Sequence, residues 1–284
     1  MSERKGSSGL KDGDFVVDYI RHGVAGYETY RAVRGSEDPA RPFDATEQVT
    51  PDLTPAGVEL AQGEAEKYFD HLDSKNDKLF FFSSNEARAI ETANIYRNVA
   101  KERGFSIIKP EHSRSRISDD SAEGDIRILN TVSINSKNLL IDSVFNPANK
   151  RGDIDLEKIP IETRDAYERA VAIIDNDDQG SWGANFAKHG DKIKEIFPGV
   201  KTAEEVYDGK FRDFLDLISF GRAKAQENNQ LNIKVLVFGH ENMVIYVLEK
   251  YFGSDELRNC EVINFQLQGD RKSMSYRGES VDLK

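Results

Sequence analysis

Short apolar runs alternate with segments of helical periodicity along the first third of the chain. The runs that we expect to form buried strands are Phe15 to Ile20, Leu79 to Phe82 and Phe105 to Ile108. After the first run, apolar residues recur at helical spacing from Pro55 to about Leu72, with Thr54 as a suitable N-cap. A second helix is expected from Glu86 to Arg103, where Gly104 ends it.

A long polar and mixed segment interrupts this pattern. Residues 110–230 begin with a charged stretch and continue with three expected helices, at about 161–176, 184–197 and 202–228. We interpret the segment as an insertion, because it is too long for a simple crossover. The earlier pattern then resumes with a strand (Ile233 to Phe238), a helix (Asn242 to Tyr251) and a last strand (Glu261 to Leu267), and the polar tail after Gly269 is expected to be frayed.

Alternating strands and helices predict an α/β fold, a three-layer α/β/α sandwich with a mostly parallel central sheet. The insertion is expected to be largely helical and to lie over the carboxyl edge of the strands. Residues 1–14 are polar and rich in glycine and serine, so we expect a flexible N-terminal segment. Residues 15–284 are then expected to form a single domain, with the insertion as a cap.

Composition narrows the classes of partner. The chain has 284 residues, 38% of them hydrophobic, and a net charge of −11. Such an acidic chain is a poor candidate for binding nucleic acid or an anionic membrane surface. Its one cysteine excludes an internal disulfide and a cysteine-based zinc site. With no secretory signal and no run of 18 apolar residues, a cytoplasmic location is expected. The sequence does not indicate which oligomeric state the protein adopts.

Charged side chains follow three of the expected strands. Arg21, His22 and Gly23 end the first strand, Arg88 lies just after the second, and His240 ends the late strand. Because ligands bind at the carboxyl ends of strands in such sheets, we expect these residues to meet if their strands are neighbours. Two guanidinium groups, two imidazoles and two helix N-termini would bind a phosphoryl group. No cofactor or metal is expected, since protein cations would supply the charge.

An imidazole held in line with phosphorus can act as a nucleophile. His22 stands at the end of a strand, which gives it a rigid position at the sheet edge. Gly23 would let the backbone turn sharply and leave the approach to the ring open. The pattern therefore indicates phosphoryl transfer through a histidine.

Four segments resemble the histidine phosphatase superfamily, also called the phosphoglycerate mutase-like family. They are "RHG" (21–23), "LTPAGVELAQ" (53–62), "SSNEARAIETA" (83–93) and "VLVFGHENMVI" (235–245). Singly the three-residue motif has little weight, but the four segments stand in the family's order. The resemblance covers about residues 15–100 and 233–267.

The resemblance implies roles for single residues. His22 would become phosphorylated, Arg21 and Arg88 would hold the phosphoryl oxygens, and His240 would stabilise the transferring group. A carboxylic acid would protonate the leaving oxygen. For that acid we expect Asp119 or Glu241 about equally, with Glu123 and Glu111 as further candidates.

The expected activity is hydrolysis of a phosphate monoester, of a small molecule or a phosphoprotein, without metal. Residues 23–26 read "GVAG", where mutases continue with serine or threonine and then asparagine, and no mutase-type clamping segment is found. A phosphoglycerate mutase-type transferase is therefore the second hypothesis. A catalytically weak phospho-ligand binding or scaffold protein is the third. Arg34 is expected at the mouth of the site, although a surface loop explains it equally well.

Overall fold

The computed structural model contains two compact units. One comprises residues 1–133, 215–241 and 256–284, and the other comprises 134–214 and 242–255. The structure describes residues 15–26, 52–108, 125–128, 160–177, 185–186, 188–198, 203–227, 233–254, 256–268 and 271–283. The predicted N-terminal segment, 1–14, lies outside these residues, and the division into a domain with a cap stays a prediction.

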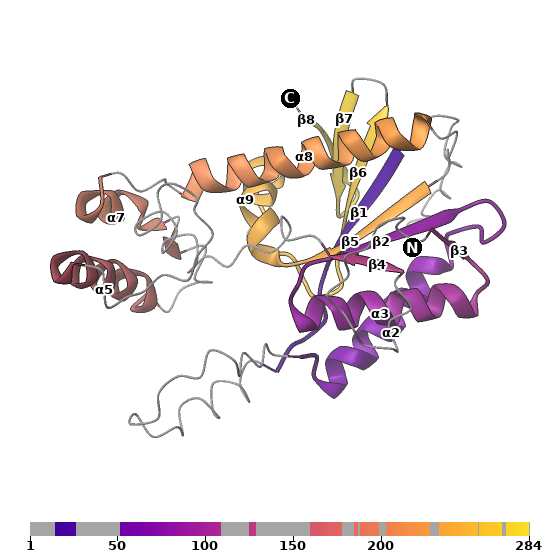
Figure 1. Ribbon diagram of the computed structural model, residues 1–284, viewed down its shortest axis with the longest axis horizontal. Coiled ribbons are helices and arrows are strands. Elements are labelled where there is room, and N and C mark those ends of the chain that lie inside the picture. Colours follow the sequence, from indigo (N-terminus) through magenta and orange to yellow (C-terminus); the bar gives the residue numbers. More distant parts are fainter. Residues whose placement is uncertain are drawn as a thin grey trace. The chain divides into compact units, whose positions relative to one another are not determined.

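An eight-stranded sheet forms the centre of the first unit (Figure 1). Its order is β3-β2-β5-β1-β6-β7-β8, and β4 also pairs with β2. The strands are β1 (Phe15–Arg21), β2 (Lys78–Ser83), β3 (Ser106–Ile107), β4 (Ile126–Ile128), β5 (Ile233–Gly239), β6 (Val262–Gln268), β7 (Arg271–Tyr276) and β8 (Glu279–Leu283).

The sheet is mixed, which corrects the expectation of a mostly parallel sheet. Strands β1 to β5 pair in parallel, whereas β6 runs antiparallel to β1 and begins an antiparallel meander through β7 to β8. The short connections that join β6, β7 and β8 explain the meander, because parallel neighbours need a long crossover. The prediction of an α/β fold with a central sheet is confirmed.

Two helices cover one face of the sheet, α2 (Pro55–Phe69) and α3 (Ala87–Glu102), and they lie side by side (Figure 1). The Thr54 hydroxyl accepts a hydrogen bond from Gly57 N, so this residue caps α2 as the sequence predicted. Phe69 and Tyr96 pack with Phe81 and Phe238 of the sheet in a buried aromatic cluster. Burying each such ring stabilises the fold by roughly 1.5–3 kcal/mol.

Alternation along β1 separates the two faces of the sheet. Ile20 belongs to the core under α2 and α3, and the carboxylate of Asp18 on the same face accepts a hydrogen bond from Tyr68. Phe15 points the other way, and its ring lies beside Gly221 in the C-terminal half of α8 (Ala203–Glu227). Within this unit, helical residues therefore pack on both faces of the sheet.

The polar C-terminal segment forms a hairpin, which corrects the expectation of a frayed tail. Strands β7 and β8 pair in register from Lys272 with Leu283 to Tyr276 with Glu279. Arg277 and Gly278 turn the chain between them with positive φ angles of 48° and 87°. Met274 and Tyr276 are buried, so the hairpin has a core face despite its polar sequence.

The second unit is largely helical where the structure describes it. Its helices are α5 (Ile161–Asp175), α7 (Gly190–Ile196), the N-terminal half of α8 and most of α9 (Glu241–Phe252). The predicted helices in 110–230 are thus present, although the segment predicted at 184–197 is helical at 185–186 and 188 before α7 begins. The expected placement of this segment over the sheet edge stays a prediction.

One ion-pair cluster fixes the connection between α5 and α7. The Asp177 carboxylate lies 2.7 Å from His189 Nε2 and 2.8 Å from Lys188 Nζ. The buried Asn185 amide donates to the backbone oxygen of Asp177 at 2.6 Å. Within the ranges given above, no helix is both long and apolar enough to cross a bilayer; the cytoplasmic location stays a prediction.

Candidate active site

Two neighbouring parallel strands bring the two histidines together. Arg21 of β1 is the register partner of Gly239 of β5, so His22 and His240 follow at the same level of the sheet. The backbone N–H of His22 donates to Gly239 O at 3.0 Å. The two imidazole centroids lie 5.0 Å apart, with their planes at 59°. Residues far apart in the sequence therefore share one place at the carboxyl ends of these strands.

The His22 ring is held in one tautomer. Its Nδ1 lies 2.6 Å from the backbone oxygen of Gly23, and because a carbonyl only accepts, Nδ1 carries the proton and donates it. The lone pair of a neutral ring is then on Nε2, which accepts a hydrogen bond from Arg88 Nε at 3.2 Å. The side chain is buried, with 3% of the residue exposed. Nε2 is the ring atom available for nucleophilic attack.

His240 takes the opposite tautomer. Arg88 Nη2 donates to its Nδ1 at 3.3 Å, so the proton of the neutral ring is on Nε2, which lies 2.8 Å from the Ser84 hydroxyl. The Tyr19 hydroxyl accepts from His240 N at 2.8 Å and donates to His240 O at 2.9 Å. Gly239 is required here, since a β-carbon at that position would overlap the Tyr19 hydroxyl.

Burial keeps both imidazoles neutral. Loss of water contact, reinforced by the nearby charges of Arg88 and Arg21, lowers the pKa of His22 to about 3, against a hydrogen bond to Gly23 that acts to raise it. Burial, and then Arg88, His22 and Arg21, hold the pKa of His240 well below its usual value. Near neutral pH, His22 is therefore neutral, with its lone pair on Nε2, and needs no separate base.

Arg88 joins the two rings through one edge of its guanidinium. Nε contacts His22, Nη2 contacts His240, and Nη1 lies 3.2 Å from the Glu86 carboxylate. Arg88 is in the first turn of α3, where a cation is disfavoured by the helix dipole. A bound anion would offset this unfavourable position, and the expected role of Arg88 in binding phosphate stays a prediction.

Arg21 reaches the same region from the end of β1. Its Nη2 lies 2.9 Å from Glu241, the first residue of α9, and its Nη1 donates to the backbone oxygen of Leu257. About a fifth of each of the Arg21 and Glu241 side chains is exposed. Glu241 thus lies beside Arg21 as its ion-pair partner, and its role as the acid stays a prediction.

Close packing holds the turn after His22. Gly23 N donates to the Thr92 hydroxyl at 3.0 Å, and that hydroxyl donates to Arg88 O at 2.7 Å. A β-carbon on Gly23 would lie 3.0 Å from Gly57 O and 3.2 Å from the Leu53 side chain. Gly23 is therefore needed for a close approach of two segments, in addition to the open access to the ring that the sequence suggested.

A loop after α9 fixes the backbone at Arg21 and His22. Asn259 Nδ2 donates to His22 O at 2.8 Å, Cys260 N donates to Arg21 O at 2.9 Å, and Arg21 N donates to Glu261 O at 3.2 Å. The sequence analysis missed the supporting residues Tyr19, Ser84, Glu86, Thr92 and Asn259. Ser84, Glu86 and Thr92 gave a signal only as residues of the "SSNEARAIETA" segment.

Several candidates lie outside the described residues: Asp119, Glu123 and Glu111 among the acids, and Arg34 at the expected mouth. Their roles stay predictions. In the part of the chain that the structure describes, no three histidine, cysteine, aspartate or glutamate side chains are grouped as they would be around a metal ion. The expectation of metal-free chemistry also stays a prediction.

No protein-family model and no curated protein sequence matches the chain. Solved structures do match it along most of its length. A phosphoglycerate mutase from Bacillus anthracis str. Sterne is 14% identical, with 96% of this chain and 93% of that chain covered and a TM-score of 0.45. The alpha-ribazole phosphatase from Shigella flexneri is also 14% identical, with coverage of 93% and 96% and a TM-score of 0.41.

A phosphoserine phosphatase variant from Entamoeba histolytica, in complex with phosphoserine, is 13% identical, with 95% of each chain covered and a TM-score of 0.36. The mutase and the alpha-ribazole phosphatase are members of the histidine phosphatase superfamily, the family whose motifs the sequence resembles. Identities and TM-scores this low transfer no activity to this chain.

Proposed function

We propose that the protein is a phosphatase of the histidine phosphatase type, which hydrolyses a phosphate monoester through a phosphohistidine at His22. The observation that carries the proposal is the arrangement around Arg88. One guanidinium edge contacts Nε2 of His22 and Nδ1 of His240, while Gly23 O holds the proton of His22 on Nδ1. This arrangement presents a neutral nucleophile and a fixed cation at the same place.

The first step transfers the phosphoryl group to the enzyme. Nε2 of His22 attacks phosphorus and the bond to the leaving oxygen breaks, while Nδ1–H remains bound to Gly23 O. Arg88 and Arg21 exchange their contacts in the protein for phosphoryl oxygens, and His240 stabilises the transferring group from the other side. A carboxylic acid, Glu241 or Asp119, gives its proton to the leaving oxygen.

The second step returns His22 to its starting state. The carboxylate that lost its proton accepts one from water, and the water oxygen attacks the phosphorus of phosphohistidine. The P–N bond breaks, its electron pair returns to Nε2, and inorganic phosphate leaves. Two guanidiniums supply the positive charge, so the proposed reaction is independent of metal ions.

The proposal is tested with p-nitrophenyl phosphate in the presence of EDTA, together with trapping of the ³²P-labelled enzyme by rapid denaturation at high pH, where phosphohistidine survives. Wild type is expected to turn over and to retain label, and His22→Ala is expected to do neither. His71→Ala is the control, because His71 is exposed in the turn after α2. Turnover by His22→Ala equal to that of wild type would refute the role of His22.

The other two hypotheses give different results in the same assay. Transfer of label from a bisphosphoglycerate to a monophosphoglycerate, faster than release of phosphate, would identify a mutase. Binding of orthovanadate without turnover of any monoester would identify a phospho-ligand binding protein. The proposed substrate remains a phosphate monoester of a small molecule or of a protein side chain.

A further inference from the structure

Glu86 is placed to cap α3 but does not do so. It occupies the N-cap position with extended backbone angles, φ −86° and ψ 136°, and its side chain makes no capping hydrogen bond. The residues that usually cap a helix are serine, threonine, aspartate and asparagine. The longer Glu86 side chain makes no such bond, so its carboxylate is available for another contact.

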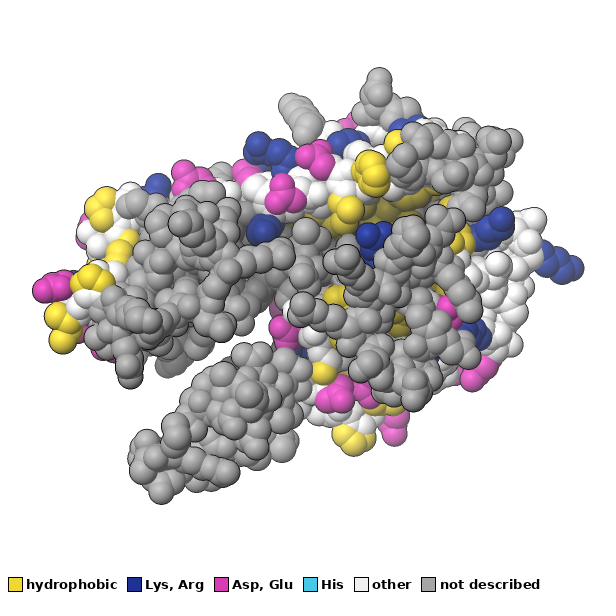
Figure 2. Space-filling model, in the orientation of Figure 1, with side chains coloured by type: hydrophobic (Ala, Val, Ile, Leu, Met, Phe, Trp, Pro, Cys, Tyr) yellow, Lys and Arg dark blue, Asp and Glu magenta, His cyan; other side chains and the backbone are white. Residues whose placement is uncertain are grey.

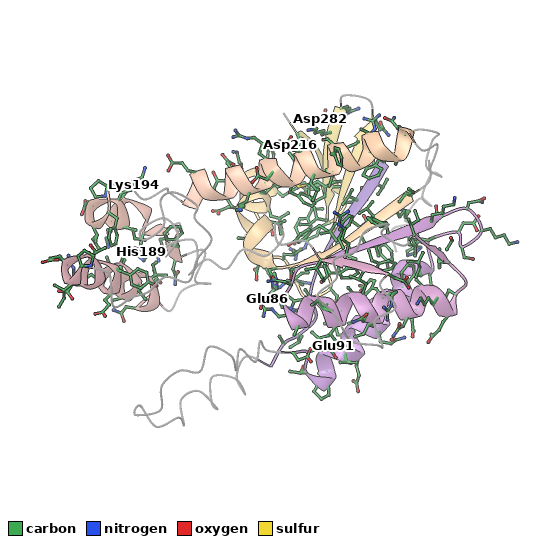
Figure 3. The ribbon with its side chains drawn as sticks, viewed as in Figure 1. Glu86, Glu91, His189, Lys194, Asp216 and Asp282 are labelled. Carbon is green, nitrogen blue, oxygen red and sulfur yellow. The ribbon has the colours of Figure 1, made fainter. Side chains whose placement is uncertain are left out.

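The other contact is with Arg88. One Glu86 carboxylate oxygen lies 3.2 Å from Arg88 Nη1, and 22% and 13% of the two side chains are exposed. The remaining nitrogens of the guanidinium contact His22 and His240 at 3.2 and 3.3 Å. Figure 3 shows Glu86 at the start of α3. Because a guanidinium is planar and rigid, a carboxylate that holds one of its nitrogens sets the direction of the opposite edge.

We propose that Glu86 is a positioning residue, which holds the Arg88 guanidinium with its Nε–Nη2 edge toward the two histidines. The proposal rests on the proposed function, since it names a residue that prepares that same site. Glu86 acts through Arg88, and no contact with substrate is assigned to it.

The same contact affects the charge of the site. Arg88 is paired with Glu86 and Arg21 with Glu241, so each guanidinium has a carboxylate within 3.2 Å. A nearby negative charge weakens the attraction of an arginine for a phosphate dianion. Glu86 should therefore favour release of inorganic phosphate at the same time as it orients Arg88.

Two substitutions separate these effects. Glu86→Gln keeps an amide oxygen that accepts from Arg88 Nη1 but removes the charge, so inhibition by inorganic phosphate should become about two- to fivefold stronger, and kcat should fall less than in Glu86→Ala. Glu86→Ala removes both, and its kcat should fall between about 10- and 100-fold, more than KM changes. Glu102→Ala is the control, since Glu102 is exposed at the far end of the same helix.

A second measurement is independent of turnover. The ¹⁵N shifts of the His22 and His240 ring nitrogens report the hydrogen bonds from Arg88, and Glu86→Ala should move them while Glu86→Gln and Glu102→Ala should not. Unchanged kcat and unchanged ring shifts in Glu86→Ala would overturn the proposal. A loss of stability in Glu86→Ala with neither change would show only a structural role and would also overturn it.

The two proposals fail in different ways. If wild type forms no phosphohistidine, the proposed function fails, yet ring shifts that respond to Glu86→Ala would still support the positioning of Arg88. If wild type forms phosphohistidine and Glu86→Ala matches it in rate and in ring shifts, only the role of Glu86 fails.

Discussion

The guanidinium of Arg21 lies 2.9 Å from the carboxylate of Glu241, so the last residue of β1 and the first residue of α9 form an ion pair beside the two histidines. Each residue adjoins one of the imidazoles in the sequence, Arg21 before His22 and Glu241 after His240. The pair therefore places a carboxyl group at the proposed phosphoryl site, and Glu241 can carry a proton there once Arg21 exchanges this contact for phosphoryl oxygens, as in the proposed first step.

This relationship leads to a test of Glu241 as the general acid. Glu241→Gln should lower kcat by roughly 10²–10⁴-fold on an alkyl phosphate, because its poor leaving group needs a proton. The loss on p-nitrophenyl phosphate should be much smaller, because nitrophenolate leaves without one. Rates of wild type and variant on both substrates measure the difference.

Glu249→Gln is a matched control for this test, on the same helix and with an exposed side chain. An equal loss on the two substrates would show that Glu241 serves the Arg21 ion pair alone. Asp119→Asn would then be expected to show the dependence on the leaving group.

A pair of carboxyl groups links α3 to the segment before α2. Burial and a hydrogen bond with Asp52 raise the pKa of Glu91 from 4.5 to about 7, although Leu53 N donates to its carboxylate at 3.0 Å and acts to lower it. The folded state then binds a proton more tightly than the unfolded chain. The contribution of this proton to the free energy of unfolding is fully present below pH 4.5 and is lost as pH rises through 7.

Glu91→Gln should therefore match wild type near about pH 5 and exceed it near about pH 8.5, since it has no charge to bury. Solvent screening limits the gain to about 1 kcal/mol, or about 2 °C in Tm. Thermal unfolding at the two pH values measures this, with Glu59→Gln on α2 as an exposed control (Glu91 is labelled in Figure 3). A difference that does not change with pH would contradict the shared proton.

Two glycines of α2 give a paired test of the turn after His22. A β-carbon at Gly57 would overlap the backbone oxygen of Val24, whereas one at Gly63 meets no atom within 4 Å. Gly57→Ala should destabilise the protein by about 1–3 kcal/mol and reduce turnover, because Val24 must move. Gly63→Ala should stabilise it by roughly 0.8–1 kcal/mol through helix propensity. Urea unfolding measures both, and a stabilising Gly57→Ala would rule out the close contact.

The C-terminal hairpin supports the backbone at Arg21 through Glu261. Arg277 holds that carboxylate with two hydrogen bonds, at 2.7 and 2.9 Å, and Glu261 O accepts from Arg21 N. Arg277→Gln should cost roughly 1–2 kcal/mol of stability and lower kcat. Arg271→Gln is the control, because its pair with Asp282 on the same hairpin is largely exposed and should contribute little. Equal effects of the two substitutions would contradict this support.

The main parts of the site could be predicted from the sequence because they depend on strand ends. An apolar run fixes the strand, and the polar residues that follow it must lie at the sheet edge, which placed Arg21, His22 and His240 without any coordinates. The supporting contacts of Tyr19, Glu86 and Asn259 could not be predicted. They depend on which atoms of distant segments meet, and a lone tyrosine, glutamate or asparagine carries no periodic signal.

The two last strands were missed for a related physical reason. The sequence "RKSMSY" of β7 places Met274 and Tyr276 in the core but surrounds them with polar residues, so its apolar content resembles that of a loop. Pairing with β6 supplies the backbone hydrogen bonds that make it a strand.

Figure 2 shows acidic and basic side chains interspersed on the face in view, although the net charge of the chain is −11.

The parallel pairing of β1 with β5 has a consequence for synthesis on the ribosome. Tyr19 and His240, which bond to each other, are 221 positions apart. The strand that carries Tyr19 and positions His22 is therefore made long before the strand that positions His240. Closing so long a loop is slow compared with forming local contacts. A nascent chain therefore cannot acquire the proposed activity gradually, because the proposed site is assembled only once β5 has emerged and inserted between β1 and β2.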